Sequence, residues 1–359
     1  MKDDEAKPNA LSEIRPNADR YSRQERFLPG GVEDSQRIRA SRVAVVGLGA
    51  LGSVVAEILA RAGVGELRLI DRDVVEWSNL QRQALYNEED ARQAIPKSEA
   101  AANHLARING DVELVPHVLD LQPHNLAIPL GRVDLIIDGS DNFAVRLLVN
   151  DWALSKGIPW VHGGCVGSSG QVRAFLPGER TCFRCLVPDV PPASAMETCD
   201  TAGVLGPATH LIASMQAAEA IKILSGHTEM VQREVTHIDL WTGKVLKVAL
   251  KPNDAVPCPA CDQGRYEFLN AITLERGEAI CGRDAVQIQP SSSHSMDLAA
   301  LERSLCGLGK IERKRFFARF NPSEFPNITL TIFNDGRVIV DGTQDVQHAI
   351  KARDRFLGA

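Results

Sequence analysis

The sequence SRVAVVGLGALG, residues 41–52, runs from an apolar stretch into three glycines spaced as Gly47-x-Gly49-x-x-Gly52. The apolar stretch predicts a buried strand, and the residues that follow have helical periodicity and end at a glycine. Glycines at this spacing let backbone N–H groups approach a phosphate at the positive end of the helix. The motif therefore predicts a nucleotide-binding loop between a strand and a helix.

A second strand, ELRLIDRD at residues 66–73, completes a β-α-β unit. Such a unit implies parallel strands joined by a right-handed crossover. Asp71 stands nineteen residues after Gly52, at a distance where an acid can bind ribose hydroxyls. Because these features suit NAD as well as ATP, the motif does not name the nucleotide by itself.

Strand and helix patterns continue to alternate as far as about residue 164, which predicts a Rossmann-like, doubly wound and mostly parallel sheet. Beyond it, residues 169–177 and 234–250 alternate apolar and polar side chains, as half-buried antiparallel strands do. Residues 327–342 predict a hairpin with Asp335-Gly336 as its turn, and residues 345–358 a final helix. We expect a solvated tail at 1–18, a main domain at 19–269 and a small α+β domain of unknown role at 270–359.

Composition excludes several classes of partner. With 44% apolar and 24% charged residues, the 359-residue chain is ordinary for a globular protein in water. A net charge of -6 gives no sign of a nucleic-acid partner, and no apolar run reaches the roughly 20 residues that span a bilayer. The N-terminus lacks the apolar region of a secretory signal, so we expect a cytoplasmic protein.

Further charged residues follow the predicted strands. SNLQRQ, residues 78–83, contains Arg82, Lys97 begins a predicted helix, and DGSDN, residues 138–142, follows an apolar strand and contains Asp141. Two cations and a second carboxylate near a nucleotide suit a triphosphate with Mg²⁺ better than a nicotinamide. The alternatives are solvated surface charge for the two cations and simple capping of the next helix for Asp141.

Eight cysteines include two C-x-x-C pairs, Cys182/Cys185 and Cys258/Cys261. In a reducing compartment such pairs bind metal more often than they form disulfides, and two pairs can meet as a tetrahedral zinc site. Four thiolates leave no open position, so the zinc would be structural. Cys165 and Cys306 are expected to be buried small apolar side chains.

Several motifs together resemble the E1-like activating enzymes of the ThiF, MoeB and HesA type. The resemblance covers roughly residues 18–265 and is carried by RYSRQ (20–24), VGLGALG (46–52), LIDRDVVEWSNLQRQ (69–83), PKSEAA (96–101), DGSDN (138–142), CDTAGVLGP (199–207) and both C-x-x-C pairs. It implies ATP- and Mg²⁺-dependent adenylation of the C-terminal Gly-Gly carboxylate of a ubiquitin-like sulfur-carrier protein of MoaD or ThiS type. A sulfur donor such as a cysteine desulfurase would then act on the activated carrier, and the enzyme would be a homodimer.

The resemblance also implies residue roles. Asp71 would hold the ribose, Asn79, Arg82 and Lys97 would contact the phosphates, and Asp141 would coordinate Mg²⁺. Arg23 would reach in from the partner subunit, and Cys199 could form a thioester or acyl-disulfide with the carrier or be a passive thiol. The implied nucleotide-binding set is Gly47, Gly49, Ala50, Gly52, Asp71, Asp73, Asn79, Arg82, Gln83, Lys97, Asp141 and Asn142, and the implied zinc ligands are Cys182, Cys185, Cys258 and Cys261.

Many relatives have a glycine where this chain has Ala50, which is tolerable if φ is negative there. His162 is expected to pack in the core or bond to backbone, because a carboxylate nucleophile needs no general base. Other readings are E1-like activation of another ubiquitin-like protein or of a peptide C-terminus, ATP-dependent cyclisation of a modified tRNA base, and a non-catalytic scaffold that binds a carrier. A NAD-dependent oxidoreductase would leave Arg82, Lys97, Arg23 and the cysteine pairs unexplained.

Overall fold

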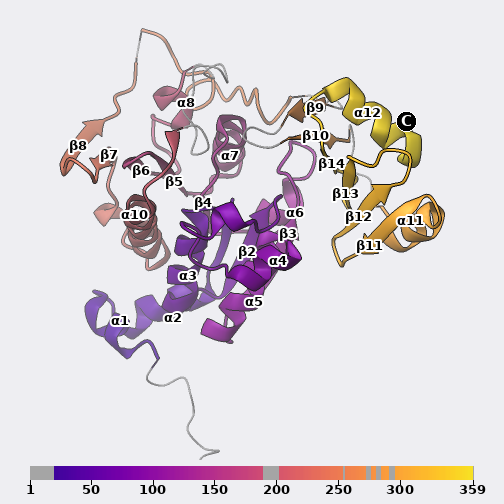
Figure 1. Ribbon diagram of the computed structural model, residues 1–359. Coiled ribbons are helices and arrows are strands. Elements are labelled where there is room, and N and C mark those ends of the chain that lie inside the picture. The colour runs from indigo at the N-terminus through magenta and orange to yellow at the C-terminus, as the bar shows by residue number, and fades with distance from the viewer. Residues whose placement is uncertain are drawn as a thin grey trace, which may run out of the picture.

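The computed structural model describes residues 20–188, 202–253, 255–271, 276–279, 284–290 and 296–358 (Figure 1). Its larger part contains an eight-stranded sheet in the order β3-β2-β1-β4-β5-β6-β7-β8. β1 to β5 pair in parallel, and β6 to β8 extend the sheet antiparallel. The strands are β1 (Arg42–Val46), β2 (Glu66–Asp71), β3 (Glu113–Val118), β4 (Leu135–Asp138), β5 (Trp160–Val166), β6 (Ser169–Phe175), β7 (Glu234–Asp239) and β8 (Lys244–Ala249). The predicted doubly wound sheet with its antiparallel extension is confirmed.

Helices cover both faces of the parallel part, because successive side chains of a strand point to opposite faces. In β1, Val43 and Val45 pack with α3, α5 and α10, whereas Ala44 and Val46 pack with α6 and α7. The helices of this part are α1 (Ser22–Phe27), α2 (Val32–Ala40), α3 (Gly52–Ala62), α4 (Glu88–Gln93), α5 (Lys97–Ile108), α6 (Ala127–Leu130), α7 (Phe143–Lys156), α8 (Phe183–Leu186) and α10 (Gly206–Leu224), with short 3₁₀ turns η1 (Trp77–Asn79) and η3 (Thr228–Met230).

One strand departs from the expectation of a half-buried edge. Every residue of β8 is exposed, including Val245, Leu246 and Val248, and Trp241 in the preceding turn is 80% exposed. The alternation in the sequence predicts a strand correctly, but β8 is the last strand of the sheet, and β7 is its one pairing partner in the described part of the chain. Alternation shows that a strand can have an apolar face, not that another element covers it.

The later part of the chain forms a second, six-stranded antiparallel sheet in the order β11-β12-β13-β14-β10-β9, drawn in orange and yellow in Figure 1. The predicted hairpin is present as β13 and β14, with Ile332 opposite Val338 and Gly336 at a φ of 86° in the turn. The elements are β9 (Arg276–Ala279), β10 (Ala285–Gln289), α11 (Leu298–Leu305), β11 (Gly309–Arg313), β12 (Phe317–Pro322), β13 (Thr329–Phe333), β14 (Val338–Asp341) and α12 (Val346–Leu357).

The second sheet has its own core, where Phe320, Leu330 and Val340 pack against Ala349 and Ala352 of α12. The expected small α+β unit with a closing helix is therefore confirmed as an architecture. Among the residues that the structure describes, no helix is both long and apolar enough to cross a membrane.

Candidate functional site

The glycine loop directly follows β1, which lies between β2 and β4 at the point where the strand order of the sheet reverses. Gly47 has a φ of 81°, and a Cβ added to it would lie 2.8 Å from the carbonyl carbon of Gly139. A Cβ on Gly52 would lie 1.8 Å from the carbonyl oxygen of Gly47. These two glycines are required because backbone meets backbone, which is the close packing that the motif predicts.

Gly49 has a different environment. The nearest atom to a Cβ added there is Nε2 of Gln83, at 3.8 Å, so the loop is open on this side. In the described part of the chain, no side chain caps the start of α3. Among the described residues, the non-glycine residues with a positive φ are Ala94 and Arg132. Ala50 therefore does not have a positive φ, and its methyl group is tolerated as expected. Open backbone at an uncapped helix start suits a bound phosphate.

Asp71 ties the glycine loop to the end of β2. Its carboxylate accepts hydrogen bonds from the backbone N–H of Leu48 and of Asp73, both at 2.7 Å. Burial raises the pKa of Asp71, and Asp73 adds to this effect while Lys97 opposes it. Asp71 thus stands at the predicted place beside the loop, with one backbone bond on each oxygen.

Lys97 is buried at the start of α5, and its Nζ lies 3.3 Å from Oδ2 of Asp73. The backbone N–H of Lys97 also donates to the carbonyl of Asp73, at 2.9 Å. Burial by itself lowers the pKa of Lys97, but the charges of Asp73, Asp71 and Asp141 outweigh this effect. The pKa is therefore raised overall, and the ammonium stays charged. The structure therefore pairs this predicted cation with Asp73, while the charges of Asp71 and Asp141 also act on it.

The amide-rich segment that contains Arg82 approaches the glycine loop through Gln83. Asn79 is buried, and its Oδ1 accepts a hydrogen bond from the N–H of Glu76 at 3.0 Å. Gln83 is also buried, and its Oε1 has no hydrogen-bond partner within the described chain. Arg82 is half-buried and donates to the carbonyl of Ser78 at 2.8 Å. The orphaned amide of Gln83 beside open Gly49 fits a loop that receives a polar ligand.

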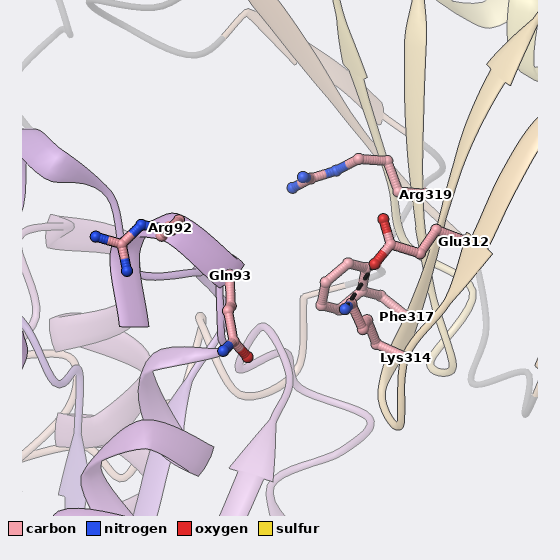
Figure 2. Close-up of a pocket in the computed structure, with 6 residues that line it drawn as sticks. All are labelled: Arg92, Gln93, Glu312, Lys314, Phe317 and Arg319. Carbon is pink, nitrogen blue, oxygen red and sulfur yellow. Dashed lines mark ion pairs between the residues drawn. The ribbon is translucent and has the colours of Figure 1, made fainter. Parts of the chain in front are cut away.

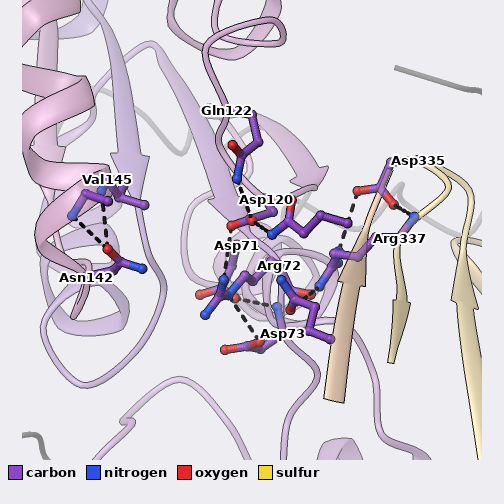
Figure 3. A network of polar contacts seen from close by, with 12 residues as sticks. Asp71, Arg72, Asp73, Asp120, Gln122, Asn142, Val145, Asp335 and Arg337 are labelled. Carbon is purple, nitrogen blue, oxygen red and sulfur yellow. Dashed lines mark hydrogen bonds and ion pairs between the residues drawn. The ribbon is translucent and has the colours of Figure 1, made fainter. Parts of the chain in front are cut away.

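Asn142, not Asp141, caps α7. Its Oδ1 accepts from the N–H groups of Ala144 at 2.8 Å and Val145 at 3.4 Å, as Figure 3 shows. The exposed carboxylate of Asp141 is therefore not the cap of α7. Asn142, predicted to bind nucleotide, is engaged through its side-chain oxygen in the helix cap.

A buried charged cluster supports the loop that carries Asp141. Asp138, fully buried, accepts hydrogen bonds from Ser140 Oγ at 2.6 Å and His162 Nδ1 at 2.7 Å, and Arg146 Nε lies 3.3 Å from it. Burial lowers the pKa of His162, so its imidazole is neutral and Gln171 can donate to the other ring nitrogen at 3.2 Å. His162 is a core residue as expected, but its partner is a carboxylate and not backbone.

Arg23 lies far from the glycine loop of its own chain. The preceding Tyr21 packs on Gly63, at the end of α3, since a Cβ on Gly63 would lie 2.6 Å from its ring. Asn109, at the end of α5, donates to the Tyr21 hydroxyl at 2.8 Å. Because α3 starts at the loop and its 11 residues span about 16 Å, this contact holds α1 at the opposite edge of the sheet. An Arg23 contact with the nucleotide therefore requires a second copy of the chain.

The four cysteines of the two C-x-x-C pairs converge. Cys182 Sγ lies 3.8 Å from Cys258 Sγ, Cys185 Sγ lies 3.6 Å from Cys261 Sγ, and all four sulfur atoms lie within 4.8 Å of one another. Sulfur atoms around tetrahedral zinc, with bonds of about 2.3 Å, stand about 3.8 Å apart. Hydrogen bonds from the neighbouring thiols, Cys182 first, lower the pKa of Cys185 to about 5. The donor set and its spacing fit a zinc ion.

The other cysteines differ from expectation or cannot be placed. Cys306 is exposed, so its predicted burial was wrong, whereas Cys165 is half-buried and packs against the main core as a small apolar side chain. Cys306 directly follows α11 and precedes a left-handed glycine, Gly307, in a surface turn. Cys199 lies outside the described residues.

Figure 3 shows the predicted Asp71 and Asp73 beside polar residues that were not predicted to belong to the site. Arg72 Nη1 lies 3.3 Å from Asp120 Oδ1, and Gln122 donates to the other oxygen at 2.9 Å. Arg337, from the second sheet, donates to the backbone carbonyl of Arg72 at 2.6 Å. Tyr86 was missed as well, although its hydroxyl donates to the carbonyl of Leu48 in the glycine loop at 2.8 Å. The only sequence signal for Arg72 was its position between two predicted site residues.

A surface hollow of about 180 Å³ lies between α4 and the β11–β12 pair (Figure 2). Lys314 and Glu312 form an ion pair of 2.6 Å at its wall. Its lining residues are Arg92, Gln93, Glu312, Lys314, Phe317 and Arg319. None of them belongs to the predicted nucleotide set, so the hollow is separate from the glycine loop.

Comparison with known families identifies the chain. A family model described as the ThiF family matches residues 21–260. The chain belongs to the ThiF family. The resemblance to E1-like activating enzymes is thereby confirmed, and membership makes the chain an enzyme of that superfamily.

Three curated relatives illustrate the range of the family. The sulfur carrier protein ThiS adenylyltransferase of Bacillus subtilis is 36% identical over 94% of this chain and 99% of its own length. The SAMP-activating enzyme E1 of Haloferax volcanii is 36% identical over 73% of this chain and 95% of its own. The sulfur carrier protein adenylyltransferase of Thermus thermophilus is 38% identical over 68% and 90%.

Solved structures show the same fold at greater distance. A crystal structure of E. coli MccB with MccA-N7isoASN has a TM-score of 0.59 and 22% identity, and it covers 68% of this chain and 75% of that one. The Microcin C7 biosynthetic enzyme MccB in complex with N-formylated MccA has a TM-score of 0.60 at 21% identity, over 68% and 76%. At these identities the likeness supports the fold alone.

Proposed function

We propose that this ThiF-family chain is an adenylyltransferase that joins AMP to the C-terminal carboxylate of a ubiquitin-like sulfur-carrier protein. The observation that carries this proposal is the ion pair of Asp73 with the buried Lys97, next to Asp71, which bonds to a glycine loop that is open at Gly49. A NAD site would have little use for such a charge cluster. The names of the full-length relatives, which act on sulfur carriers, support the substrate class.

The charges of the cluster suit a nucleoside triphosphate with a divalent cation. A triphosphate would be repelled by three carboxylates unless a cation lay between them, and carboxylate oxygens are the ligands that Mg²⁺ prefers. Asp141, exposed and free of the capping role, is the proposed Mg²⁺ ligand. When bound, Mg²⁺ would neutralise charge on the phosphates during displacement of pyrophosphate.

The remaining roles follow the position of each side chain. Asp71 would bind the ribose with its remaining lone pairs, and Asn79, Arg82 and Lys97 would contact the phosphates. The carrier carboxylate attacks the α-phosphate, negative charge grows there, and fixed cations stabilise it. Arg82 must turn away from the carbonyl of Ser78 to take part, which costs one exposed hydrogen bond. Asp73, Gln83 and the loop residues from Gly47 to Gly52 would complete the nucleotide site.

We further propose a homodimer, in which Arg23 of one copy serves the nucleotide site of the other, and a structural zinc ion held by the four clustered cysteines. The zinc would join α8 to the 258–261 segment and would take no part in the reaction. Cys199 stays a proposed acyl acceptor, and a sulfur donor such as a cysteine desulfurase stays the proposed next partner. The proposed domains are residues 19–269 and 270–359, in a protein of the cytoplasm.

Carrier-dependent exchange of labelled pyrophosphate into ATP tests the proposal. Purified protein is mixed with Mg-ATP and a panel of carrier proteins that end in Gly-Gly, each also supplied without its last glycine. We expect exchange with one intact carrier, loss of exchange with its truncated form, and loss in Asp141→Ala. Glu88→Gln, which alters an exposed carboxylate on α4, is the matched control and should retain exchange. If none of the carriers supports exchange although the protein measurably binds ATP, the proposed substrate is refuted.

A further inference from the structure

The second sheet packs directly on the loop that leaves β2, beside the proposed nucleotide site. Val74 and Val118 of the first part form an apolar cluster with Phe317, Phe333 and Ile339 of the second. The match to the ThiF family ends at residue 260, so it assigns nothing to this second sheet. The contact lies at the carboxyl ends of β2 and β3, the edge at which open α/β sheets bind ligands.

Arg337 is the polar centre of this contact. Only 1% of its surface is exposed, and its guanidinium carbon lies 3.9 Å from the centroid of the Phe333 ring. Nη2 donates to the carbonyl of Arg72 at 2.6 Å, while Asp335 Oδ2 lies 3.7 Å from Nε (Figure 3). A buried guanidinium is costly unless its donors are used. Nη1 reaches Oε1 of Gln287 only at 3.5 Å, and Nε has no hydrogen-bond partner among the described residues, so the bond to Arg72 is the shortest that this side chain makes. The bond to Arg72 is therefore a strong constraint on both partners.

A second polar bridge runs in parallel through Asp120. One of its oxygens takes Arg72 Nη1 at 3.3 Å, and the other accepts from Gln289 of β10. The second sheet thus holds Arg72 twice, by its carbonyl through Arg337 and by its guanidinium through Asp120. Gln289 belongs to β10, whereas Arg337 lies in the turn just before β14, so the loop is held at two separate points of the second sheet.

The residues on either side of Arg72 face the nucleotide loop. Asp71 accepts from the N–H of Leu48, and Asp73 lies 3.3 Å from Lys97. Arg337 also lies close enough to Asp73 to favour its ionised form. The tripeptide of residues 71–73 is thus held on one side by the second sheet and presents its carboxylates to the proposed phosphate site on the other.

We infer that Arg337 is a positioning residue for nucleotide binding, and that the C-terminal sheet completes the nucleotide site by holding residues 71–73 in place. The inference rests on the proposed function. Arg337 touches no reacting atom. It acts through the Arg72 carbonyl on Asp73, and through Asp73 on Lys97.

The test measures binding of a fluorescent ATP analogue with Mg²⁺ to the full chain, without any carrier. A hydrogen bond from a charged donor is worth roughly 10- to 100-fold in an equilibrium constant, and only part of that reaches Lys97, so Arg337→Met should raise the Kd at least about fivefold. Arg337→Lys keeps a cationic donor and should recover much of the loss. Amide hydrogen exchange of residues 71–76 should accelerate in Arg337→Met even without nucleotide.

Two controls separate positioning from stability. Arg355→Met makes the same chemical change at an exposed ion pair of α12 and should bind nucleotide like the natural chain. Leu330→Ala weakens the core of the second sheet without touching Arg72, so it should lower the melting temperature and leave the Kd unchanged. If Leu330→Ala weakens binding as much as Arg337→Met, or if Arg337→Met binds normally, the inference is overturned while the proposed function stands. If the natural chain binds no ATP analogue, both are overturned.

Discussion

Replacing Lys97 with methionine should abolish most activity while leaving the protein folded. Lys97 pairs with Asp73 at 3.3 Å, and only 9% of its side chain is exposed. Asp71 and Asp141 also favour its charged form. Methionine has a similar length and no charge, so it can occupy the same buried path beside α5. The substitution therefore removes the ammonium group and little else.

The size of each effect follows from the surroundings. Loss of one fixed donor to the charge that develops in a transition state typically costs about 100- to 1,000-fold in kcat. Breaking a fully buried ion pair can cost about 3–5 kcal/mol, because a charge is left without a partner. Here the stranded Asp73 is 47% exposed and still has Arg72 at 3.8 Å. We therefore expect only about 1 kcal/mol of lost stability, close to that of a surface pair.

Pyrophosphate exchange gives the rate, and thermal unfolding gives the stability. Lys97→Met should lose exchange by at least about 100-fold with a melting temperature lowered by about 2 °C. Lys351→Met, on the exposed face of α12, makes the same change away from the site and should alter neither measurement. Exchange within a few-fold of the natural chain would refute the role of Lys97. A melting temperature lowered by about 10 °C or more would show instead that the charge of Lys97 mainly stabilises the fold.

Two further predictions concern stability. Cys258→Ser should lose bound zinc, measured by elemental analysis, and should unfold at lower temperature, because structural zinc contributes about 10–16 kcal/mol of binding energy. Exposed Cys306→Ser is the control. Retained zinc in the Cys258 variant would contradict the proposed zinc site. His227 Nε2 lies 2.7 Å from Asp34 Oδ2, and this hydrogen bond raises the pKa of His227. The pair therefore stabilises the fold below the unfolded-state pKa of about 6.5 and loses this effect as pH rises through the higher folded-state pKa. In urea unfolding, His227→Asn should cost more stability at acidic than at alkaline pH, and an equal cost at both would count against the pair.

Local patterns were sufficient for much of the fold and for part of the site. The apolar run before Gly47 predicts β1 because both faces of a central parallel strand are buried, and the structure buries Val43 to Val46. The glycines at 47 and 52 leave no room for a side chain, so their spacing alone indicates the loop. The C-x-x-C spacing likewise predicts a four-cysteine site, because each pair can supply two ligands from one turn.

Two neighbouring residues show where local patterns fall short. The sequence leaves open whether Asp141 caps α7 or remains available for a metal, since either Asp141 or Asn142 can be the last residue before the helix. The structure assigns the cap to Asn142. The two possibilities differ by one residue in where α7 begins. That position depends on how β4 and the Asp138 cluster place the loop, because either residue type can cap a helix.

The sequence by itself determined the parallel sheet, the glycine loop, the paired cysteines and the C-terminal hairpin, because short-range periodicity and turn chemistry are sufficient for each of them. Only the tertiary structure joined Arg337 to the carbonyl of Arg72, across 265 positions of the chain. A donor that bonds to a backbone carbonyl leaves no mark on the sequence of its partner, since every residue has such a carbonyl. Which one it meets is decided by how two separately formed sheets pack, and so the link between the second sheet and the nucleotide site becomes visible only in the folded chain.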